Sequence, residues 1–335
     1  MDRFPLFRLP AVALAEVMKM FHLFDLTMLK MCSKRTHKWI KAFRVHRNDL
    51  TIEVVHDYWI RVQIYNRPKN EYTVYQITDY TTKMNRSIKI GDLVIPMTFE
   101  IIDDSEYHMN LYFEDKIEGL KAVTEYFCSL FQQEIYDVRV SSALNLNGPV
   151  TVMEWILKRQ KRFHFYMIGS ENMSETVAAD LLSKINNAEE VSIEFEFGAN
   201  FKPSFTFEGD CLEMQDSPWF TLNNLFSMNC SYLFVGETKL TNMDMNAFLK
   251  HWISNDLKFK EIIIGMEAIR LDVLFSGIPG IQRTNNVERV YKNSDNRSLY
   301  MNGGFDIKRY DGVTATLVHN GGFGVSEFWM IVLDN

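Results

Sequence analysis

The spacing of hydrophobic residues changes along the chain, and each change predicts a different kind of structure. Up to about residue 46, apolar residues recur three and four positions apart, as from Leu14 to Phe21, which is the spacing of one helix face. From 47 to 115 they alternate with polar residues, as in residues 58–64, which is typical of strands. Beyond 116, helical and strand patterns follow one another. The chain is therefore predicted to combine α+β and α/β parts.

Residues 1–46 are predicted to form three short helices. Leu9-Pro10 opens the first, because proline is favoured in the first turn of a helix. Trp39 and Ile40 lie on the apolar face of the third and are candidate core residues. Three helices of this size are marginal alone, yet they carry more apolar side chains than one small core can use. The excess predicts docking, either on another protein or on the rest of the chain.

Three further regions follow from the patterns. Residues 47–115 predict an antiparallel β-meander. Residues 116–275 repeat a helix and a strand, with strand centres about 28 residues apart, which favours a solenoid similar to a leucine-rich repeat over an ordinary α/β sheet. One longer step contains residues 198–211, which we expect to loop out. Residues 276–335 predict a C-terminal β region with a hairpin whose turn is Asp311-Gly312.

Charge is distributed unevenly along the chain. Residues 1–47 carry a net charge of +7, whereas the remainder carries −14. This asymmetry indicates two modules with different partners, and a basic module can meet nucleic acid, a membrane surface or an acidic protein. The acidic remainder disfavours nucleic acid, because it would repel phosphate. No apolar run is long enough to span a membrane, so we expect neither a nucleic-acid nor a membrane partner.

The sequence contains few residue patterns that are typical of catalytic, nucleotide-binding or metal-binding sites. It lacks the nucleophile elbow, the glycine-rich phosphate loops and the zinc-binding helix motif. Its histidines are scattered without ligand spacing, and Cys128 lies on an apolar helix face, where a core role is expected. Widely spaced cysteines are typical of reduced thiols in a cytoplasmic or nuclear protein. We therefore predict no catalytic residue, no cofactor and no metal site.

Two segments resemble parts of one known family. The run from Phe4 to Ile40, with Leu9-Pro10, Asp25-Leu26 and the CSKR stretch at 32–35, resembles an F-box of the form common in nematodes. Residues 218–265, with the run Asn246 to Ile253, resemble the type 2 F-box-associated domain of the same family. The later GGFDIKRYDGVTATLVH is similar to the C-terminal part of these proteins.

The resemblance implies a substrate-recognition subunit of a Skp–cullin–F-box ubiquitin ligase, rather than an enzyme. Residues 1–46 would bind the acidic Skp adaptor, and through it a cullin, while the C-terminal region would bind an unknown target protein. The side chains expected at the adaptor are Leu9, Pro10, Leu14, Val17, Leu26 and Leu29. Exposed strand residues such as Glu194 and Glu196, or residues 198–211, are candidate target contacts.

Two alternatives stay open at this point. Val12 and Trp39 depart from the F-box pattern, which leaves room for a stand-alone repeat-type interaction module with a degenerate F-box. An enzyme built on the α/β region is the other alternative, and a deep pocket with convergent titratable groups would favour it.

Overall fold

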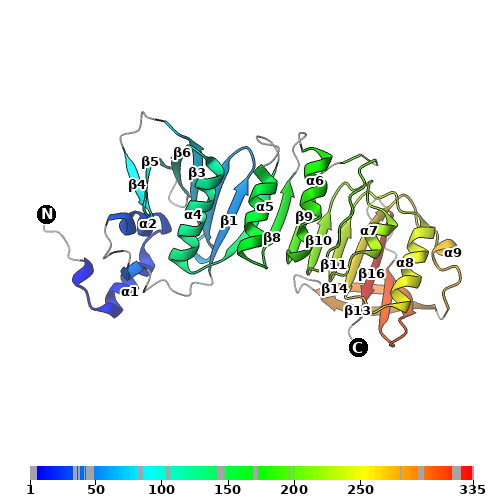
Figure 1. Ribbon diagram of the computed structural model, residues 1–335. Helices are drawn as coiled ribbons and strands as arrows, with labels where there is room; N and C mark the ends of the chain where they lie inside the picture. The colour runs from blue at the N-terminus through cyan, green and yellow to red at the C-terminus, as the bar shows by residue number, and fades with distance from the viewer. Residues whose placement is uncertain are drawn as a thin grey trace. The chain divides into compact units, whose positions relative to one another are not determined.

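The chain divides into two compact units, residues 1–140 and 141–335. The computed structural model describes residues 6–32, 36, 38–40, 42, 49–81, 86–102, 106–141, 148–168, 173–195, 197–198, 200–279, 281–292, 298–318 and 326–333. Both units pack helices on an open β-sheet (Figure 1). The mixed α/β character predicted from the sequence is confirmed.

The first unit contains a seven-stranded sheet with the strand order β7-β1-β2-β3-β6-β5-β4. Its strands are β1 Leu50–His56, β2 Ile60–Asn66, β3 Glu71–Asp79, β4 Ser87–Ile90, β5 Leu93–Ile101, β6 Glu106–Phe113 and β7 Ile135–Val140. A single turn of 3₁₀ helix, η2 Arg67–Lys69, connects β2 to β3. Alternate residues of β2 are buried, from Ile60 to Ile64, as the period-two pattern predicts.

The predicted antiparallel meander is correct for β1, β2 and β3 and again for β4, β5 and β6, but it is wrong for the pairing of β3 with β6. The chain leaves β3, forms the outer hairpin β4–β5, and returns as β6 between β5 and β3. As a result β6 runs parallel to β3, from Tyr72 opposite Glu106 to Asp79 opposite Phe113. Periodicity detects each strand but carries no information on the direction of its neighbour.

Helices cover one face of this sheet. They are η1 Leu6–Arg8, α1 Ala11–Met20, α2 Leu23–Cys32 and α4 Lys116–Phe131. Within the third predicted helix, the described residues 36, 38–40 and 42 are helical, with Ile40 buried and Trp39 half-buried. The three-helix F-box as a whole remains a prediction. Asp115 caps α4 by accepting hydrogen bonds from the amides of Ile117 and Glu118.

The helix α4 and the strand β7 belong to the first unit. The apolar side chains predicted to mark this helix, from Leu120 to Leu130, are buried, and β7 pairs in parallel with β1. The sequence pattern instead assigned these elements to the repeat region, residues 116–275. The difference arises because a βα pattern does not reveal which sheet a strand joins.

The second unit contains nine strands in the order β8-β9-β10-β11-β12-β16-β15-β14-β13. The first five are β8 His164–Ile168, β9 Glu190–Glu194, β10 Cys211–Met214, β11 Tyr232–Val235 and β12 Glu261–Met266. Each is parallel to the next one along the chain. Neighbours in sequence are thus neighbours in space, which a repeat architecture requires. The leucine-rich-repeat-like solenoid itself remains a prediction.

The helices of this unit alternate with the parallel strands. They are α5 Gly148–Arg159, α6 Glu175–Leu182, α7 Leu222–Phe226, α8 Asn242–Ser254 and α9 Leu271–Leu274, with the 3₁₀ turn η3 Ile185–Asn187. Helices α6, α7 and α8 lie along one face of the strands (Figure 1). Thr241 and Asp244 form a capping box at the start of α8, and Phe248, Leu249 and Trp252 of the same helix are buried.

Residues 198–211 form a loop that packs its aromatic side chains into the core. Apart from Cys211, which begins β10, and Phe207, which forms an isolated bridge with Met228, the described residues of this segment lie outside helices and strands. Its phenylalanines belong to a buried cluster around a buried tryptophan. The members of this cluster are Phe195, Phe197, Phe201, Phe205, Phe207 and Trp219.

The C-terminal strands form an antiparallel sheet on β12. They are β13 Gln282–Lys292, β14 Ser298–Lys308, β15 Thr314–Val318 and β16 Ser326–Val332. The predicted hairpin is confirmed, with Lys308 opposite Thr314 and Gly312 at a positive φ of 94°. Gly304 has a φ of 134°, and a Cβ there would lie 2.6 Å from Thr316 Cγ2. Glycine is therefore required at this position.

Replacing Phe207 by alanine tests whether the 195–207 segment is part of the core. Phe207 is fully buried, so we expect a loss of about 3–5 kcal/mol in the free energy of unfolding, measured by urea denaturation. The control is Phe226→Ala, at a ring that is 37% exposed, for which we expect a clearly smaller loss. Equal stability of F207A and the wild type would show that the segment is a surface loop.

A buried ion pair links three strands of the C-terminal sheet. Arg289 donates from Nη1 and Nη2 to the two carboxylate oxygens of Asp306, at 2.9 and 2.8 Å. Thr316 Oγ1 donates to Asp306 Oδ1 at 2.8 Å. Partial burial acts to raise the pKa of Asp306, but the hydrogen bonds from Arg289 and Thr316 outweigh it and hold that pKa below its ordinary value of 3.8.

The lowered pKa predicts how stability depends on pH. Asp306 contributes fully to the free energy of unfolding at any pH above the pKa of this carboxyl in the unfolded chain. This contribution is lost as the pH falls through the pKa of Asp306 in the folded protein. At pH 7, Asp306→Asn should lower the free energy of unfolding by about 1–3 kcal/mol, and the difference from wild type should shrink below about pH 4. Asp272→Asn, at an exposed ion pair, serves as the control with little effect. A difference between D306N and wild type that stays constant down to pH 2 would contradict the pair's role.

Candidate functional site

The helix α1 divides its apolar side chains between the protein's interior and its surface. Leu14 and Met18 are buried, whereas Val12 and Met20 are each 78% exposed. Pro10 precedes the first turn and is exposed, and its carbonyl accepts a hydrogen bond from the amide of Leu14 at 2.9 Å. One side of α1 therefore holds it to the protein, and the other presents apolar surface to a partner.

The helix α2 is buried on most of its circumference. Leu23, Phe24, Leu26 and Thr27 are all at most 6% exposed. The ring of Phe24 stacks on that of Tyr107 in β6, with ring centroids 5.0 Å apart. The surplus of apolar residues in this segment is thus used, at least in part, to dock α2 on the sheet of its own chain (Figure 1).

Two polar contacts fix the orientation of α2. The hydroxyl of Tyr75 in β3 donates to Thr27 Oγ1 at 3.0 Å, and Thr27 in turn donates to the carbonyl of Leu23. Lys30 Nζ lies 3.5 Å from the ring centroid of Tyr126 in α4, a cation–π contact. Burial raises the pKa of Tyr75, and it raises that of Tyr126 to about 12, so both hydroxyls stay protonated at neutral pH.

A polar junction connects the α1–α2 corner with the β2–β3 turn. Lys69 Nζ donates to the carbonyl of Phe21 at 3.0 Å, where a cation is favoured at the C-terminal end of a helix. His22 Nδ1 lies 2.9 Å from Glu71 Oε1, and Asn66 Nδ2 donates to Glu71 Oε2 at 3.2 Å. We call Lys69, His22, Glu71 and Asn66 the corner cluster.

The predicted adaptor residues fall into two groups. Leu14 and Leu26 are fully buried, so in this arrangement they hold α1 and α2 together and onto the sheet. Leu9, Val17 and Leu29 are half-buried and Pro10 is exposed. Val12 and Met20 are not among the six predicted adaptor residues, although both are exposed whereas Leu9, Val17 and Leu29 are half-buried. Their place on the helix face opposite to Leu14 and Met18 is the sequence signal for this exposure.

The segment 218–265 and the C-terminal hairpin contact each other. Asn246 in α8 donates from Nδ2 to the carbonyls of Leu274 and Ser276, at 2.8 and 2.9 Å. At the end of α8, the carbonyl of Ile253 accepts a hydrogen bond from the amide of Tyr310 in the hairpin turn. The two stretches that resemble one family in sequence therefore form one packed structure.

The described residues contain no cluster of metal ligands. Among them, no three His, Cys, Asp or Glu side chains gather as a metal site. Burial raises the pKa of the Cys230 thiol to about 12, and Cys128 is buried in α4, as predicted for a core residue.

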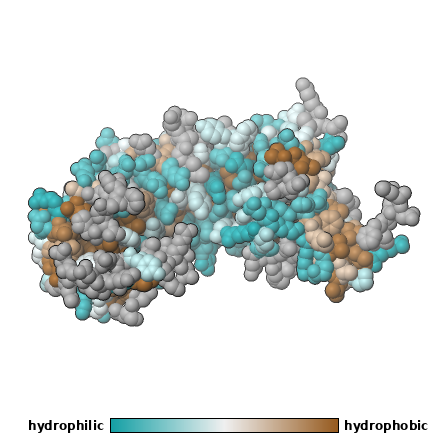
Figure 2. Space-filling view, turned by 180° about the vertical axis from the view of Figure 1, so that it is seen from behind, coloured by the Kyte–Doolittle hydropathy of each residue, from teal (hydrophilic) through white to brown (hydrophobic). Residues whose placement is uncertain are grey.

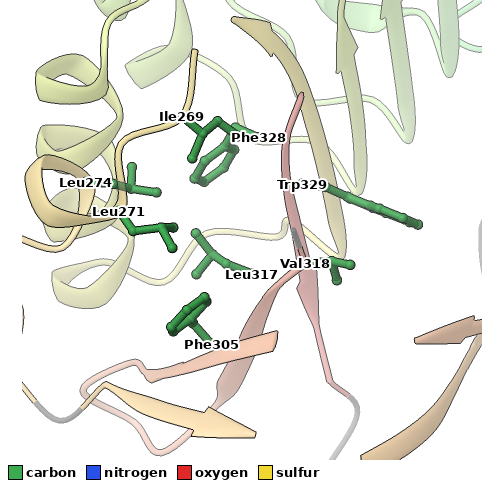
Figure 3. Close-up of a pocket in the computed structure, with 8 residues that line it drawn as sticks. All are labelled: Ile269, Leu271, Leu274, Phe305, Leu317, Val318, Phe328 and Trp329. Carbon is green, nitrogen blue, oxygen red and sulfur yellow. The ribbon is translucent and has the colours of Figure 1, made fainter. Parts of the chain in front are cut away.

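One small pocket of the second unit lies between α9 and the strands β14, β15 and β16 (Figure 3). Apolar side chains line it almost entirely: Ile269, Leu271, Leu274, Phe305, Leu317, Val318, Phe328 and Trp329. It holds no titratable side chain, so it gives the enzyme alternative no support. In the described part of the chain, no helix has the length and apolar character of a membrane span.

Comparison with known proteins finds one family model and one nematode protein that are similar to this chain. Residues 197–258 match the family model described as F-box associated. The Skn-1 dependent zygotic transcript 15 protein of Caenorhabditis elegans is 28% identical over 249 residues, which are 64% of this chain and 67% of the relative. No solved structure matches the chain.

These matches confirm the resemblance inferred from the sequence: the chain is similar to nematode proteins that carry an F-box-associated domain. The matched segment contains β10, α7, β11 and all of α8. It begins at Phe197, so it also includes most of the buried phenylalanine cluster that the sequence had suggested would loop out.

Replacing Phe24 by alanine tests the docking of α2. The variant removes a buried ring between Tyr107 and Phe99, so we expect the free energy of unfolding to fall by about 3–5 kcal/mol. Val12→Ala on the exposed side of α1 is the control and should stay within about 0.5 kcal/mol of wild type. If both variants unfold at the wild-type urea concentration, α2 does not pack on the sheet in solution.

Proposed function

We propose that this protein is the substrate-recognition subunit of a Skp–cullin–F-box ubiquitin ligase. The observation that carries the proposal is the presence, in one chain, of an F-box-like N-terminal pattern and a segment matched by the F-box-associated family. Residues 1–46 would bind the Skp adaptor and through it a cullin. The C-terminal region would bind the target protein.

The division of α1 into an inner and an outer side supports this role. Pro10, Val12 and Met20 offer exposed apolar side chains beside the half-buried Leu9 and Val17, and a central apolar cluster of this kind supplies most of the affinity of an interface. The charge of +7 on residues 1–47 would accelerate encounter with an acidic adaptor. Leu14 and Leu26 would contribute indirectly, by holding the helices in place.

Such a subunit acts by proximity rather than by chemistry of its own. Binding the target on one surface and the adaptor on another raises the effective concentration of target lysines near the conjugating enzyme. The lysine nucleophile belongs to the target, so the receptor chain needs no catalytic residue.

A double substitution, Leu9→Ala with Pro10→Ala, tests the adaptor interface. We expect the affinity of the full chain for purified Skp adaptor to fall about tenfold or more, or about 1.4 kcal/mol, in calorimetric titration. The control is Leu93→Ala with Val94→Ala, two similarly sized truncations at exposed residues of β5, which should bind as wild type does.

Circular dichroism on every variant separates lost binding from lost structure. Unchanged affinity in a folded Leu9, Pro10 double variant would refute the assignment of these residues. A folded wild-type chain with no affinity for the adaptor would instead favour the stand-alone interaction module. Point variants are preferable to removal of residues 1–46, because α2 is part of the first unit's core.

A further inference from the structure

The sheet of the second unit has one face that α6, α7 and α8 leave uncovered. Strands β8 to β12 turn alternate residues toward these helices, and those residues are buried, for example Val191, Leu212 and Leu233. The residues between them point to the other face, where most are half-exposed or exposed. Figure 2 shows the molecule from the side opposite to Figure 1, and much of its surface is hydrophilic.

The parallel register arranges these outward residues in two rows across the strands. The first row is His164, Glu190, Cys211, Tyr232 and Glu261. The second row is Tyr166, Ser192, Glu213, Phe234 and Ile263. Neighbours within a row are about 5 Å apart, and the rows are about 7 Å apart. We call these ten residues the open face.

The open face is acidic and aromatic. It contains three glutamates and three aromatic rings but no lysine or arginine, and its one histidine lies 3.6 Å from the carboxylate of Glu190. Glu194, two residues beyond the second row on β9, is also exposed. Carboxylates attract cationic side chains over a distance of about 10 Å, and aromatic rings bind the same cations by cation–π contact.

One carboxylate of the open face is already engaged within the protein. Glu261 is 3% exposed, and its Oε1 accepts a hydrogen bond from Trp329 Nε1 at 3.0 Å. Burial raises the pKa of Glu261 despite the hydrogen bonds from Trp329 and Tyr291. The carboxylates available to a partner are therefore those of Glu190 and Glu213, which are exposed and half-buried.

We infer that the open face binds a lysine- or arginine-rich extended segment of a partner protein. Charge complementarity favours a basic segment, because the two rows contain glutamates. An acidic segment is disfavoured, because the rows contain no lysine or arginine to attract it. The spacing of the rows matches that of side chains two apart on an extended peptide, about 6.6–7 Å. The inference rests on the proposed function, because the partner is then the protein to be ubiquitylated, and such a segment would carry acceptor lysines.

The family match and the open face share two strands. β10 and β11 lie within the matched residues 197–258, and they supply Cys211, Glu213, Tyr232 and Phe234 to the rows. The role proposed for this domain, target recognition, would thus use a surface that the helices leave uncovered.

The test uses the full chain and a labelled peptide of six Lys-Ala repeats, with a peptide of six Glu-Ala repeats as the comparison. Fluorescence anisotropy should show binding of the lysine peptide only, weakening as salt rises from 50 to 300 mM. The double variant Glu190→Lys with Glu213→Lys should weaken binding at least tenfold. Phe234→Ala should weaken it about two- to fivefold through the lost cation–π contact.

A control variant with the same change in net charge excludes a general charge effect. Glu154→Lys with Glu267→Lys reverses two exposed carboxylates outside the rows, and it should bind the lysine peptide within about twofold of wild type. Glu190→Gln with Glu213→Gln provides a milder pair if the lysine variant fails to fold, and it should still weaken binding several-fold.

Three results would overturn the inference. They are equal binding of both peptides, unchanged affinity in the Glu190 and Glu213 variants, and an equal loss in the control variant. A fourth result would also overturn it: the chain associates with itself, and the open-face variants abolish this association without changing peptide binding. The occupant of the open face would then be the basic N-terminal segment of a second copy. Adaptor affinity, measured separately on the same variants, should stay at the wild-type value, so failure of this inference is distinguishable from failure of the ligase assignment.

Discussion

The alternation of side chains along a strand is the constraint on which both units depend. A strand that buries one set of residues under helices must turn the other set to the opposite face. In β2 every second residue from Ile60 to Asn66 is buried, and β9 shows the same alternation from Glu190 to Glu194. The helices α6, α7 and α8 of the second unit pack on one face of its strands. Residues on the other face therefore need not be apolar to fill the core under these helices.

That freedom separates the residues that hold the fold from those that face outward. The residues facing the helices, such as Leu212, Met214 and Leu233, are fully buried and can change only with loss of packing. Glu213, between two of them, makes no comparable demand on the core. Under the proposed function, changes in the outward rows of residues would alter the target without altering the fold.

The sequence predicted well what depends on local pattern. The apolar faces of α4 and α8, the Asp311-Gly312 hairpin and the N-terminal helix after Pro10 all appear where the periodicity and the turn residues place them. What it could not predict depends on partners distant along the chain. The direction of β6 beside β3 and the docking of α2 on Tyr75 and Tyr107 belong to this class. The burial of Phe201, Phe205 and Phe207 was missed because proline, glycine and polar residues surround them, which is typical of exposed loops.

The proposed adaptor-binding segment shows the same difference between local pattern and distant contacts. Motif resemblance pointed to this segment, but the solvent exposure of each side chain in it depends on how the helices pack on the sheet. Leu14 and Leu26 satisfied the sequence criterion and are buried, while Val12 departs from the family pattern and is among the most exposed apolar residues. An apolar residue at helical spacing is required both by a core and by an interface, so only the packing of the sheet separates the two.

The corner cluster has a consequence for a chain that lacks its first helices. Lys69, Glu71 and Asn66 join the β2–β3 turn to the end of α1 and the start of α2. A truncated chain that began after residue 46 would keep the pairing of Glu71 with Lys69 and Asn66, but it would lose His22 and the carbonyl of Phe21. It would also uncover the rings of Phe99 and Tyr107 near the short edge strand β4. Because exposed rings and strand edges promote aggregation, the two helices also protect this sheet from association with other chains.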